Sequence, residues 1–317
     1  MSDLRQLPLF PHAPDSPADL NRHTHLGDTI GLFQGALLKE GKSAHTVAAF
    51  TADLQLLAEF CGADRSLGNF TTTQLNEFMH WLEYGRGVPC SRKSYARRVT
   101  TLKVFFKWLH QIGAIPDDPA RPLLQRSGPA PLAEILTPDD ELSALAFARG
   151  LRRGKKPDAR PEVVFRLILN TGIKKSEAMR LLPADIDRTE PDQPLLIVRH
   201  KIKNVYKERR IDLDPTLLPV LDEYLGQYAQ PRAKKGGLIF SCTARNLEYI
   251  LADISEGADL PVRIAFEMLR WTSAVRDYQA GVEPDVIRDK LGLSEVSWVE
   301  TFSKIKRLAS DQASAEV

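Results

Sequence analysis

The sequence predicts a mainly α-helical protein of two domains, the second of which contains a small antiparallel β-hairpin. Three observations lead to this prediction. The chain has 317 residues, which is more than one compact core usually holds. Apolar residues recur at helical spacing through most of the chain. A proline-rich stretch near the middle separates two such regions, because it can form neither a helix nor a central strand.

The composition excludes several classes of protein. Hydrophobic residues make up 43% and charged residues 26%, which is the balance of a globular chain. The three cysteines lie far apart without a CxxC pair, which argues against a disulfide scaffold or a structural zinc site. No apolar run could cross a bilayer, and the N-terminus lacks the layout of a signal peptide. We therefore expect a cytoplasmic protein with no metal and no cofactor.

The first part of the chain is predicted to be a disordered tail, residues 1–27, followed by a bundle of four helices, residues 28–116. The tail is rich in proline, and the helices show apolar residues at spacings of three and four. Ser43 and Thr71 are predicted N-caps of the second and third helices. The fourth helix runs from Ser91 to about Gln111, and one face of it is predicted core. That face consists of Tyr95, Val99, Leu102, Phe106 and Leu109.

The fourth helix also carries a one-signed basic face. No acidic residue lies between Ser91 and Gln111 to neutralise it. Such a face suits a phosphate backbone, and the alternative is an ordinary solvated helix surface. The residues concerned are Lys93, Arg97, Lys103 and Lys107.

Residues 117–135 are the predicted proline-rich linker, and residues 136–317 form the second domain. Thr137 and Pro138 mark a capped helix start, and a further helix breaks at Thr171-Gly172. A short apolar run, 195–198, and an alternating segment, 209–213, are predicted strands that flank a basic loop. Because only Glu208 offsets the positive charge, we expect this hairpin to contact DNA through His200, Lys201, Lys203, Lys207, Arg209 and Arg210. A second basic run points more weakly to the same role: Arg149, Arg152, Arg153, Lys155 and Lys156.

Four degenerate motifs follow one another in the second domain. They are Thr171-Gly172-Ile173-Lys174-Lys175-Ser176-Glu177, Lys207-Glu208-Arg209-Arg210, Met268-Leu269-Arg270 and Leu291-Gly292-Leu293-Ser294. In this order and spacing the chain resembles the tyrosine recombinase (phage integrase) family of the XerC/XerD type over nearly all of its length. The resemblance implies a SAM-like core-binding domain at the N-terminus and an integrase-type catalytic domain at the C-terminus.

The family joins a tyrosine hydroxyl to a DNA phosphate, so its site needs a nucleophile, surrounding cations and a proton donor for the leaving oxygen. The resemblance places the family's first arginine at Lys174, its lysine at Lys201 or Lys203, its two histidines at Glu267 and Leu293, and its second arginine at Arg270. The nucleophile falls on Phe302, which has no oxygen. Only Lys201 and Arg270 retain the expected residue type.

No shift of the alignment restores the nucleophile, because no tyrosine lies in the last 39 residues. Thr301 and Ser303 flank the position, but a shift of one residue turns a helical side chain by about 100°, which we expect to point it away from the phosphate. Phe302 and Leu293 are expected to fill space beside Trp298 and Phe266. Arg270 either contacts phosphate or pairs with Glu267 one turn away.

These observations predict a DNA-binding homologue that does not cleave DNA. We expect its two domains to close around duplex DNA and to act as an architectural or regulatory partner in site-specific recombination or in a mobile element. An active recombinase with an unusual nucleophile is one alternative, and an interaction scaffold without DNA is another. Possible partners are an active recombinase, a second copy of the chain and the bacterial replication sliding clamp. The clamp is suggested by Gln6-Leu7-Pro8-Leu9-Phe10, a short pattern that also arises by chance.

Overall fold

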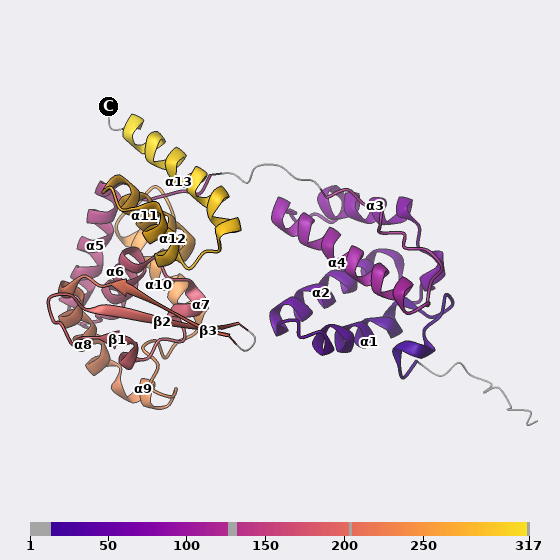
Figure 1. The fold of residues 1–317 in the computed structure, drawn as a ribbon, viewed down its shortest axis with the longest axis horizontal. Coiled ribbons are helices and arrows are strands. Elements are labelled where there is room, and N and C mark those ends of the chain that lie inside the picture. Colours follow the sequence, from indigo (N-terminus) through magenta and orange to yellow (C-terminus); the bar gives the residue numbers. More distant parts are fainter. Residues whose placement is uncertain (1–13, 126–131, 203–204, 316–317) are drawn as a thin grey trace, which may run out of the picture. The chain divides into compact units, whose positions relative to one another are not determined.

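The computed structural model describes residues 14–125, 132–202 and 205–315, and the chain divides into two compact units, residues 1–129 and 130–317 (Figure 1). Each unit has its own hydrophobic core. Most described residues are helical, and the described strands form a single antiparallel sheet in the second unit. The predicted fold class is therefore confirmed.

The N-terminal unit is built from four α-helices. They are α1 (Leu26–Lys39), α2 (Ala44–Cys61), α3 (Thr72–His80) and α4 (Arg92–Gln111), and α3 continues into a π-helical turn, Trp81–Gly85. The N-caps predicted at Ser43 and Thr71 are confirmed, since each side chain accepts a hydrogen bond from a backbone amide of the first turn, at 3.2 and 3.3 Å.

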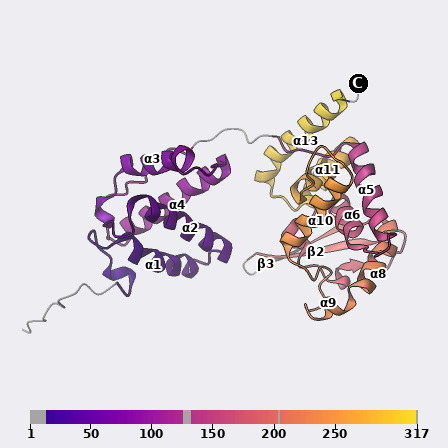
Figure 2. The same ribbon diagram turned by 180° about the vertical axis from the view of Figure 1, so that it is seen from behind.

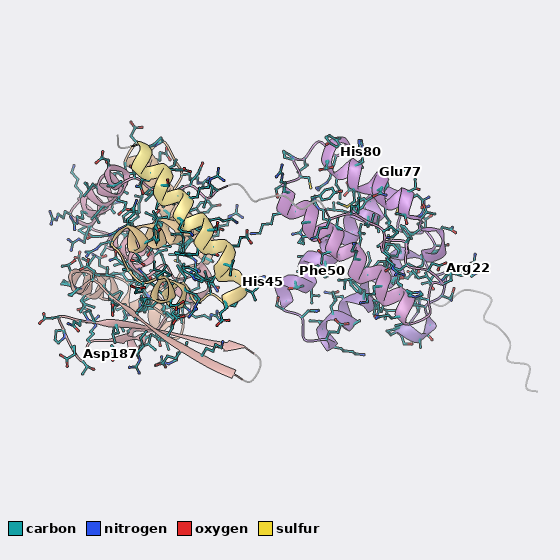
Figure 3. All side chains as sticks on the ribbon, turned by 45° about the horizontal axis from the view of Figure 1, so that its top comes forward. Arg22, His45, Phe50, Glu77, His80 and Asp187 are labelled. Atoms are coloured by element: carbon teal, nitrogen blue, oxygen red, sulfur yellow. The ribbon has the colours of Figure 1, made fainter. Side chains whose placement is uncertain are left out.

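Aromatic packing holds this core together. The predicted core face of α4 is confirmed, because all of its residues are buried. Phe105 of α4 meets Phe33 of α1 edge to face, with ring centroids 5.1 Å apart. Figure 3 shows Phe50 within the helices, whereas the exposed Arg22, Glu77 and His80 lie on the outside.

The N-terminal unit extends beyond the predicted residues 28–116 at both ends. Leu20 is 6% exposed and packs in the core, so the part of the predicted tail from residue 14 onward is folded. Ala120 and Leu123 of the predicted linker are also buried in the same core. Apolar side chains next to prolines can still pack without a helix, which the spacing of apolar residues does not reveal.

In the C-terminal unit, several helices pack around one central helix, α6. Its described helices are α5 (Pro138–Arg152), α6 (Arg160–Thr171), α7 (Lys175–Ala178), α8 (Leu218–Gln227), α9 (Ala229–Ala233), α10 (Ala244–Gly257), α11 (Phe266–Gln279), α12 (Pro284–Leu291) and α13 (Glu295–Ala315). Helices α5, α8, α10 and α11 pack around α6 (Figures 1 and 2). Nearly every side chain of α6 is buried, as expected for a helix enclosed on all sides. None of the helices in the described ranges is long and apolar enough to span a membrane.

The sheet has the strand order β1-β2-β3, with β1 at Ile186–Asp187, β2 at Leu195–Ile202 and β3 at Val205–Asp212. The β2–β3 ladder continues outward to the pair Ile202 and Val205. The prediction of a long basic loop between the strands is therefore wrong for most of these residues, because they belong to the strands. Ile202, Val205 and Tyr206 are strand-forming residue types, which favours pairing here in spite of the charges.

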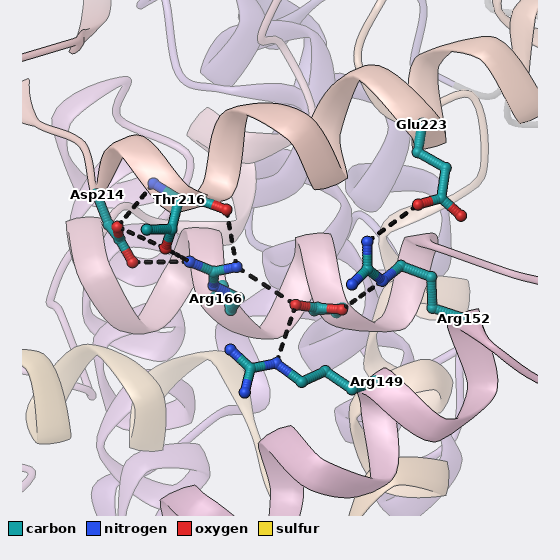
Figure 4. Close-up of polar contacts among 7 residues, drawn as sticks. Arg149, Arg152, Arg166, Asp214, Thr216 and Glu223 are labelled. Atoms are coloured by element: carbon teal, nitrogen blue, oxygen red, sulfur yellow. Dashed lines mark hydrogen bonds and ion pairs between the residues drawn. The ribbon is translucent and has the colours of Figure 1, made fainter. Parts of the chain in front are cut away.

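An ion network around the buried Glu162 links α5 and α6 to Asp214, which precedes α8, and to Glu223 within α8. Glu162 of α6 is 1% exposed, and its carboxylate lies 3.4 Å from Arg149 Nε, 2.9 Å from Arg152 Nε and 3.3 Å from Arg166 Nη1 (Figure 4). Arg166 also donates to Asp214 at 2.7 Å, and Arg152 to Glu223 at 3.0 Å. Both guanidinium groups take part in this internal network, and the DNA contact predicted for Arg149 and Arg152 stays a prediction.

Candidate active-site cavity and basic surfaces

A cavity of about 690 Å³ in the C-terminal unit brings together most of the positions that the resemblance assigns to catalysis. Lys174, the residue that precedes α7, lines the cavity, and so do Glu267 and Arg270 of α11. Leu293 lines it from the connection between α12 and α13. Thr301 of α13 also lines the cavity, whereas Phe302 does not.

A glycine places Lys174 at the cavity. Helix α6 ends at Gly172, which has a φ of 58° in the left-handed region. A Cβ atom there would also come within 3.0 Å of Leu291 Cδ2. The chain therefore reverses tightly after α6, and Lys174, in extended conformation, begins the short helix α7.

Two of the cations at the cavity have depressed pKa values. Burial lowers the pKa of Lys174 against the opposing charge of Glu177, and the nearby Arg270 and Arg209 act in the same direction as burial. Burial likewise lowers the pKa of Arg270 to about 10. Arg270 therefore remains a cation at neutral pH.

Arg270 binds the carboxyl ends of two helices. Its Nη1 donates to the carbonyl of Gly172, which ends α6, and its Nη2 donates to the carbonyl of Leu291 at 2.9 Å, which ends α12. Helix C-termini carry partial negative charge, so this is a favourable place for a guanidinium. Among the described residues the hydrogen bonds of Arg270 go to these carbonyls and it forms no ion pair within 4 Å with Glu267, whose charge nevertheless raises the pKa of Arg270 against the effect of burial.

The cavity carries a net positive charge among the described residues. Lys175 pairs with Glu248 at the cavity wall. This pairing leaves Lys174, Arg263 and Arg270 against the single carboxylate of Glu267. The arrangement can hold an anion. Arg263 escaped the sequence analysis, because it lies in an irregular segment before α11 with no periodic pattern around it.

Phe302 belongs to an aromatic cluster beside α11. Its ring stacks on Trp298, with centroids 5.1 Å apart and 24° between the planes, and meets Tyr278 edge to face at 5.7 Å. The predicted packing against Trp298 is confirmed, while Phe266 belongs to the larger core of the unit. Tyr278, the tyrosine that contacts this position, does not line the cavity.

Thr301 takes the place at the cavity that the sequence analysis gave to Phe302. Its hydroxyl donates to the carbonyl of Ser297 at 2.8 Å, within α13. The expectation that this neighbour points away from the cavity is wrong, because α13 turns its 301 position inward and its 302 position toward Trp298. Ser303 is exposed and does not line the cavity.

Arg209 does not lie free on the hairpin. Its Nη1 and Nη2 donate to Glu177 at 3.0 and 2.7 Å, and its Nε donates to the carbonyl of Lys290 at 3.1 Å. Only 15% of the side chain is exposed. The guanidinium therefore joins β3 to α7 and to the end of α12, and the DNA contact of Arg209 stays a prediction.

Glu177 is held as a carboxylate by these contacts. Burial alone would raise its pKa, but hydrogen bonds from Arg209 and from the Lys174 amide, together with the charges of both residues, lower the pKa below the usual value of a glutamate. Glu177 thus fixes both the start of α7 and the position of Arg209. The sequence draws attention to Glu177 because it lies in the motif around Lys174. The sequence does not predict that Arg209 is its partner.

The other hairpin cations are placed only in part. Lys207 and Arg210 are exposed on β3. Lys201 lies in β2 opposite Tyr206, and Lys203 falls outside the described residues. The assignment of the family's lysine to Lys201 or Lys203 stays a prediction.

The basic face of α4 is real but contains one neutralised member. Lys93 and Lys107 are exposed and Lys103 is half-buried, and none of these three pairs with a carboxylate among the described residues. Arg97, by contrast, forms an ion pair of 2.7 Å with Asp53 of α2. The expectation of an unneutralised face is wrong at Arg97, because the acidic partner comes from another helix.

Comparisons with known proteins agree with this architecture. Residues 30–113 match the family model described as "Phage integrase, N-terminal SAM-like domain". The chain is 27% identical to tyrosine recombinase XerC of Mycobacterium sp. (strain KMS), and the match covers 87% of this chain and 94% of that protein. It is 22% identical to tyrosine recombinase XerD of Listeria innocua, covering 86% and 92%.

Solved structures show the same fold. The structure of the XerH site-specific recombinase bound to a palindromic difH substrate superposes with a TM-score of 0.69 at 18% identity, covering 92% of this chain and 85% of that one. The N-terminal family match, the two relatives and the shared fold agree with one another. Residues 30–113 match the SAM-like domain of phage integrases, and the chain is similar to tyrosine recombinases over most of its length.

Proposed function

We propose that this protein binds duplex DNA without cleaving it, and that it acts as an architectural or regulatory partner in site-specific recombination. An active recombinase, or further copies of the chain, would assemble with it on DNA. The relatives are tyrosine recombinases, and the XerH structure contains its DNA substrate, which supports DNA as the ligand.

One observation carries the proposal of inactivity. The nucleophile position is occupied by Phe302, whose ring packs against Trp298 and Tyr278 instead of lining the cationic cavity. Glu267 and Leu293 stand where the family has histidines, so the cavity also lacks those proton donors and gains a carboxylate that repels phosphate. The remaining cations can hold a phosphate, but no tyrosine attacks it.

Covalent trapping tests this proposal. The full chain would be incubated with its selected duplex carrying a nick that traps covalent intermediates, and any adduct would be mapped by mass spectrometry. We expect none from the wild type and none from Phe302→Tyr, since one hydroxyl restores neither the cations nor the proton donors. Adding Lys174→Arg, Glu267→His and Leu293→His to Phe302→Tyr is expected to recover slow cleavage only if the ring at position 302 also turns from Trp298 into the cavity.

The same experiment decides the rival function of an active recombinase. Thr301 favours that rival, because its hydroxyl-bearing side chain lines the cavity with Lys174 and Arg270. A wild-type adduct mapped to Thr301, Ser303 or a tyrosine would overturn the inactive assignment. If the adduct is on Thr301, then Thr301→Val should abolish it while Ser303→Ala, as the matched control, should not.

A third possibility is an interaction scaffold that no longer binds DNA. The basic face of α4 and the exposed hairpin cations support DNA binding instead, because phosphate contacts made by lysines release counterions and weaken with salt. Duplex binding that falls steeply between low and moderate salt would support our proposal. Absence of duplex binding at low salt would instead favour the interaction scaffold as the function.

The segment Gln6–Phe10 is proposed to dock on a bacterial sliding clamp, and it lies outside the described residues. Leu9 and Phe10 would anchor such a peptide in an apolar cleft. A labelled peptide of residues 1–20, titrated with a purified sliding clamp, should bind saturably, and Leu9→Ala with Phe10→Ala should remove the binding. Failure of the wild-type peptide to bind at tens of micromolar clamp would contradict this partner.

A further inference from the structure

The guanidinium of Arg97 on α4 is held in one orientation by a buried carboxylate. Arg97 Nε donates to Asp53 Oδ2 at 3.0 Å, and Arg97 Nη2 donates to Asp53 Oδ1 at 2.7 Å. Asp53 is 2% exposed, whereas 43% of the Arg97 side chain is exposed. The pair thus joins a rigid internal anchor to a cation that reaches solvent.

Asp53 is itself fixed by its neighbours. The Thr101 hydroxyl donates to Asp53 Oδ2 at 2.9 Å, and Arg98 Nε lies 3.6 Å from Asp53 Oδ1. Arg98 is largely buried and donates to Cys90 Sγ at 2.8 Å, so it does not share the solvent-exposed position of Arg97. The carboxylate therefore has compensating partners in the core even without Arg97. Charge compensation of Asp53 alone does not explain an arginine that is nearly half exposed.

The contact with Asp53 leaves a defined part of the guanidinium unoccupied. The side-on edge, formed by Nε and one N–H of Nη2, is used. The end-on edge, formed by Nη1 and the other N–H of Nη2, makes no hydrogen bond to a described residue. Two parallel N–H groups at this spacing match O6 and N7 of guanine in the major groove. A flexible arginine would have to give up rotamer freedom to present this edge, and Asp53 removes that cost beforehand.

The neighbours of Arg97 on α4 suit a helix that lies against DNA. Lys93 lies one turn before Arg97, Thr100 lies one turn after it, and all three are exposed. Lys103 and Lys107 extend the same basic face toward the end of the helix. Lysines bind phosphates as point charges and carry no base information, whereas an oriented arginine can discriminate bases. The face thus combines phosphate-binding residues with one residue that is able to read sequence.

We propose that Arg97 reads a guanine in the major groove of the DNA site, and that Asp53 is its positioning residue. This inference rests on the proposed DNA binding and names the residue that determines sequence preference at one position of the site.

Selection of DNA from a random duplex pool by the full-length protein tests the inference. The wild type should enrich a guanine at a defined position. Arg97→Lys keeps the charge and can still pair with Asp53, but it loses the planar fork. We expect this variant to bind the pool while discriminating guanine at that position at least about tenfold less well. Lys93→Gln is the matched control, and it should bind all sequences more weakly with the same base preference.

Asp53→Asn provides a second measurement, with folding checked by circular dichroism. It keeps Arg97 but removes the charge that orients it, so guanine preference should fall while the salt dependence of binding stays that of the wild type. Unchanged guanine preference in Arg97→Lys would overturn the assignment of Arg97, and unchanged preference in Asp53→Asn would overturn the role of Asp53. Absence of wild-type binding to any duplex would instead overturn the proposed function itself.

Discussion

Glu177 illustrates how a residue beside the cavity can be tied to the fold. Its carboxylate accepts hydrogen bonds from the Arg209 guanidinium and from the Lys174 amide, and its side chain is 4% exposed. These contacts fix the start of α7 relative to β3. Glu177 therefore affects both the stability of the C-terminal unit and the position of Lys174.

Replacement of Glu177 by Gln should cost stability at neutral pH and less in acid. The pKa of Glu177 is lowered in the folded state, so the carboxylate contributes stability above its unfolded pKa of about 4.3, and that contribution is lost as the pH falls through the folded pKa. At pH 7 the variant leaves Arg209 without its ionic partner, which should cost about 2 kcal/mol. Urea unfolding of both proteins at pH 7, 5, 4 and 3 should show the difference shrinking below pH 4.

Glu300→Gln is the matched control for this measurement. Glu300 also pairs with a cation, Lys304, but its side chain is 73% exposed. Its removal should change stability little at any pH, because exposed ion pairs contribute little. An equal loss of stability in both variants, or a Glu177→Gln deficit that does not change with pH, would contradict the assignment to Glu177.

At the level of residues, the sequence predicts the residue type at each motif position but not its partner. Asp53 and Arg97 lie 44 positions apart, and Glu177 and Arg209 lie 32 apart. Such pairs depend on how helices cross, and helical periodicity carries no information about that. The inward position of Thr301 was missed for the same reason, since the rotation of α13 about its axis is set by the packing of Trp298 and Phe302.

At the level of elements, local signals were sufficient where a helix is amphipathic and capped. The spacing on α4 predicts its buried face, and Ser43 and Thr71 predict where α2 and α3 begin. The long β2–β3 ladder was not predictable, because its basic residues suggested a loop while backbone pairing across the hairpin decided the strand length. The π-helical turn at Trp81–Gly85 likewise had no local signature.

The basic face of α4 predicts a specific effect on DNA affinity. Reversal of Lys93, Lys103 and Lys107 to Glu should abolish duplex binding at moderate salt, because each lysine that contacts a phosphate becomes a repulsive charge. Arg97 is left unchanged so that its pair with Asp53 survives. The measurement is a fluorescence-anisotropy titration across several salt concentrations.

Lys234→Glu with Lys235→Glu serves as the control, since these exposed lysines lie outside both basic surfaces. Their reversal should lower affinity only slightly. Neutralising Lys207 alone should reduce the salt slope by up to about one unit. If the α4 triple variant retains wild-type affinity with circular dichroism unchanged, α4 does not bind DNA.

At the level of the whole molecule, two separate cores predict two unfolding steps. Each compact unit buries its own hydrophobic cluster, so each should unfold cooperatively by itself. Calorimetry of the full chain should resolve two transitions. A variant in one core should then move only one of them.

Glu162→Gln and Leu75→Ala distinguish the two transitions. Removing the Glu162 charge leaves three arginines around a neutral amide and should destabilise the C-terminal unit by about 3 kcal/mol. Leu75 is fully buried in the N-terminal core, and its truncation should cost that unit about 3 kcal/mol. A single transition that both variants shift equally would show that the units unfold together.

The two carbonyls that Arg270 binds also give this side chain a role in the fold that is independent of DNA cleavage. A chain that does not cleave DNA, as we propose for this one, is free to replace a nucleophile or a proton donor, such as those that the resemblance places at Phe302 and Leu293. It is not free to replace Arg270, since any neutral side chain would leave the ends of α6 and α12 without their shared donor. Because Arg270 joins the ends of α6 and α12, the fold alone can explain its presence, and an arginine at this position does not by itself indicate cleavage activity.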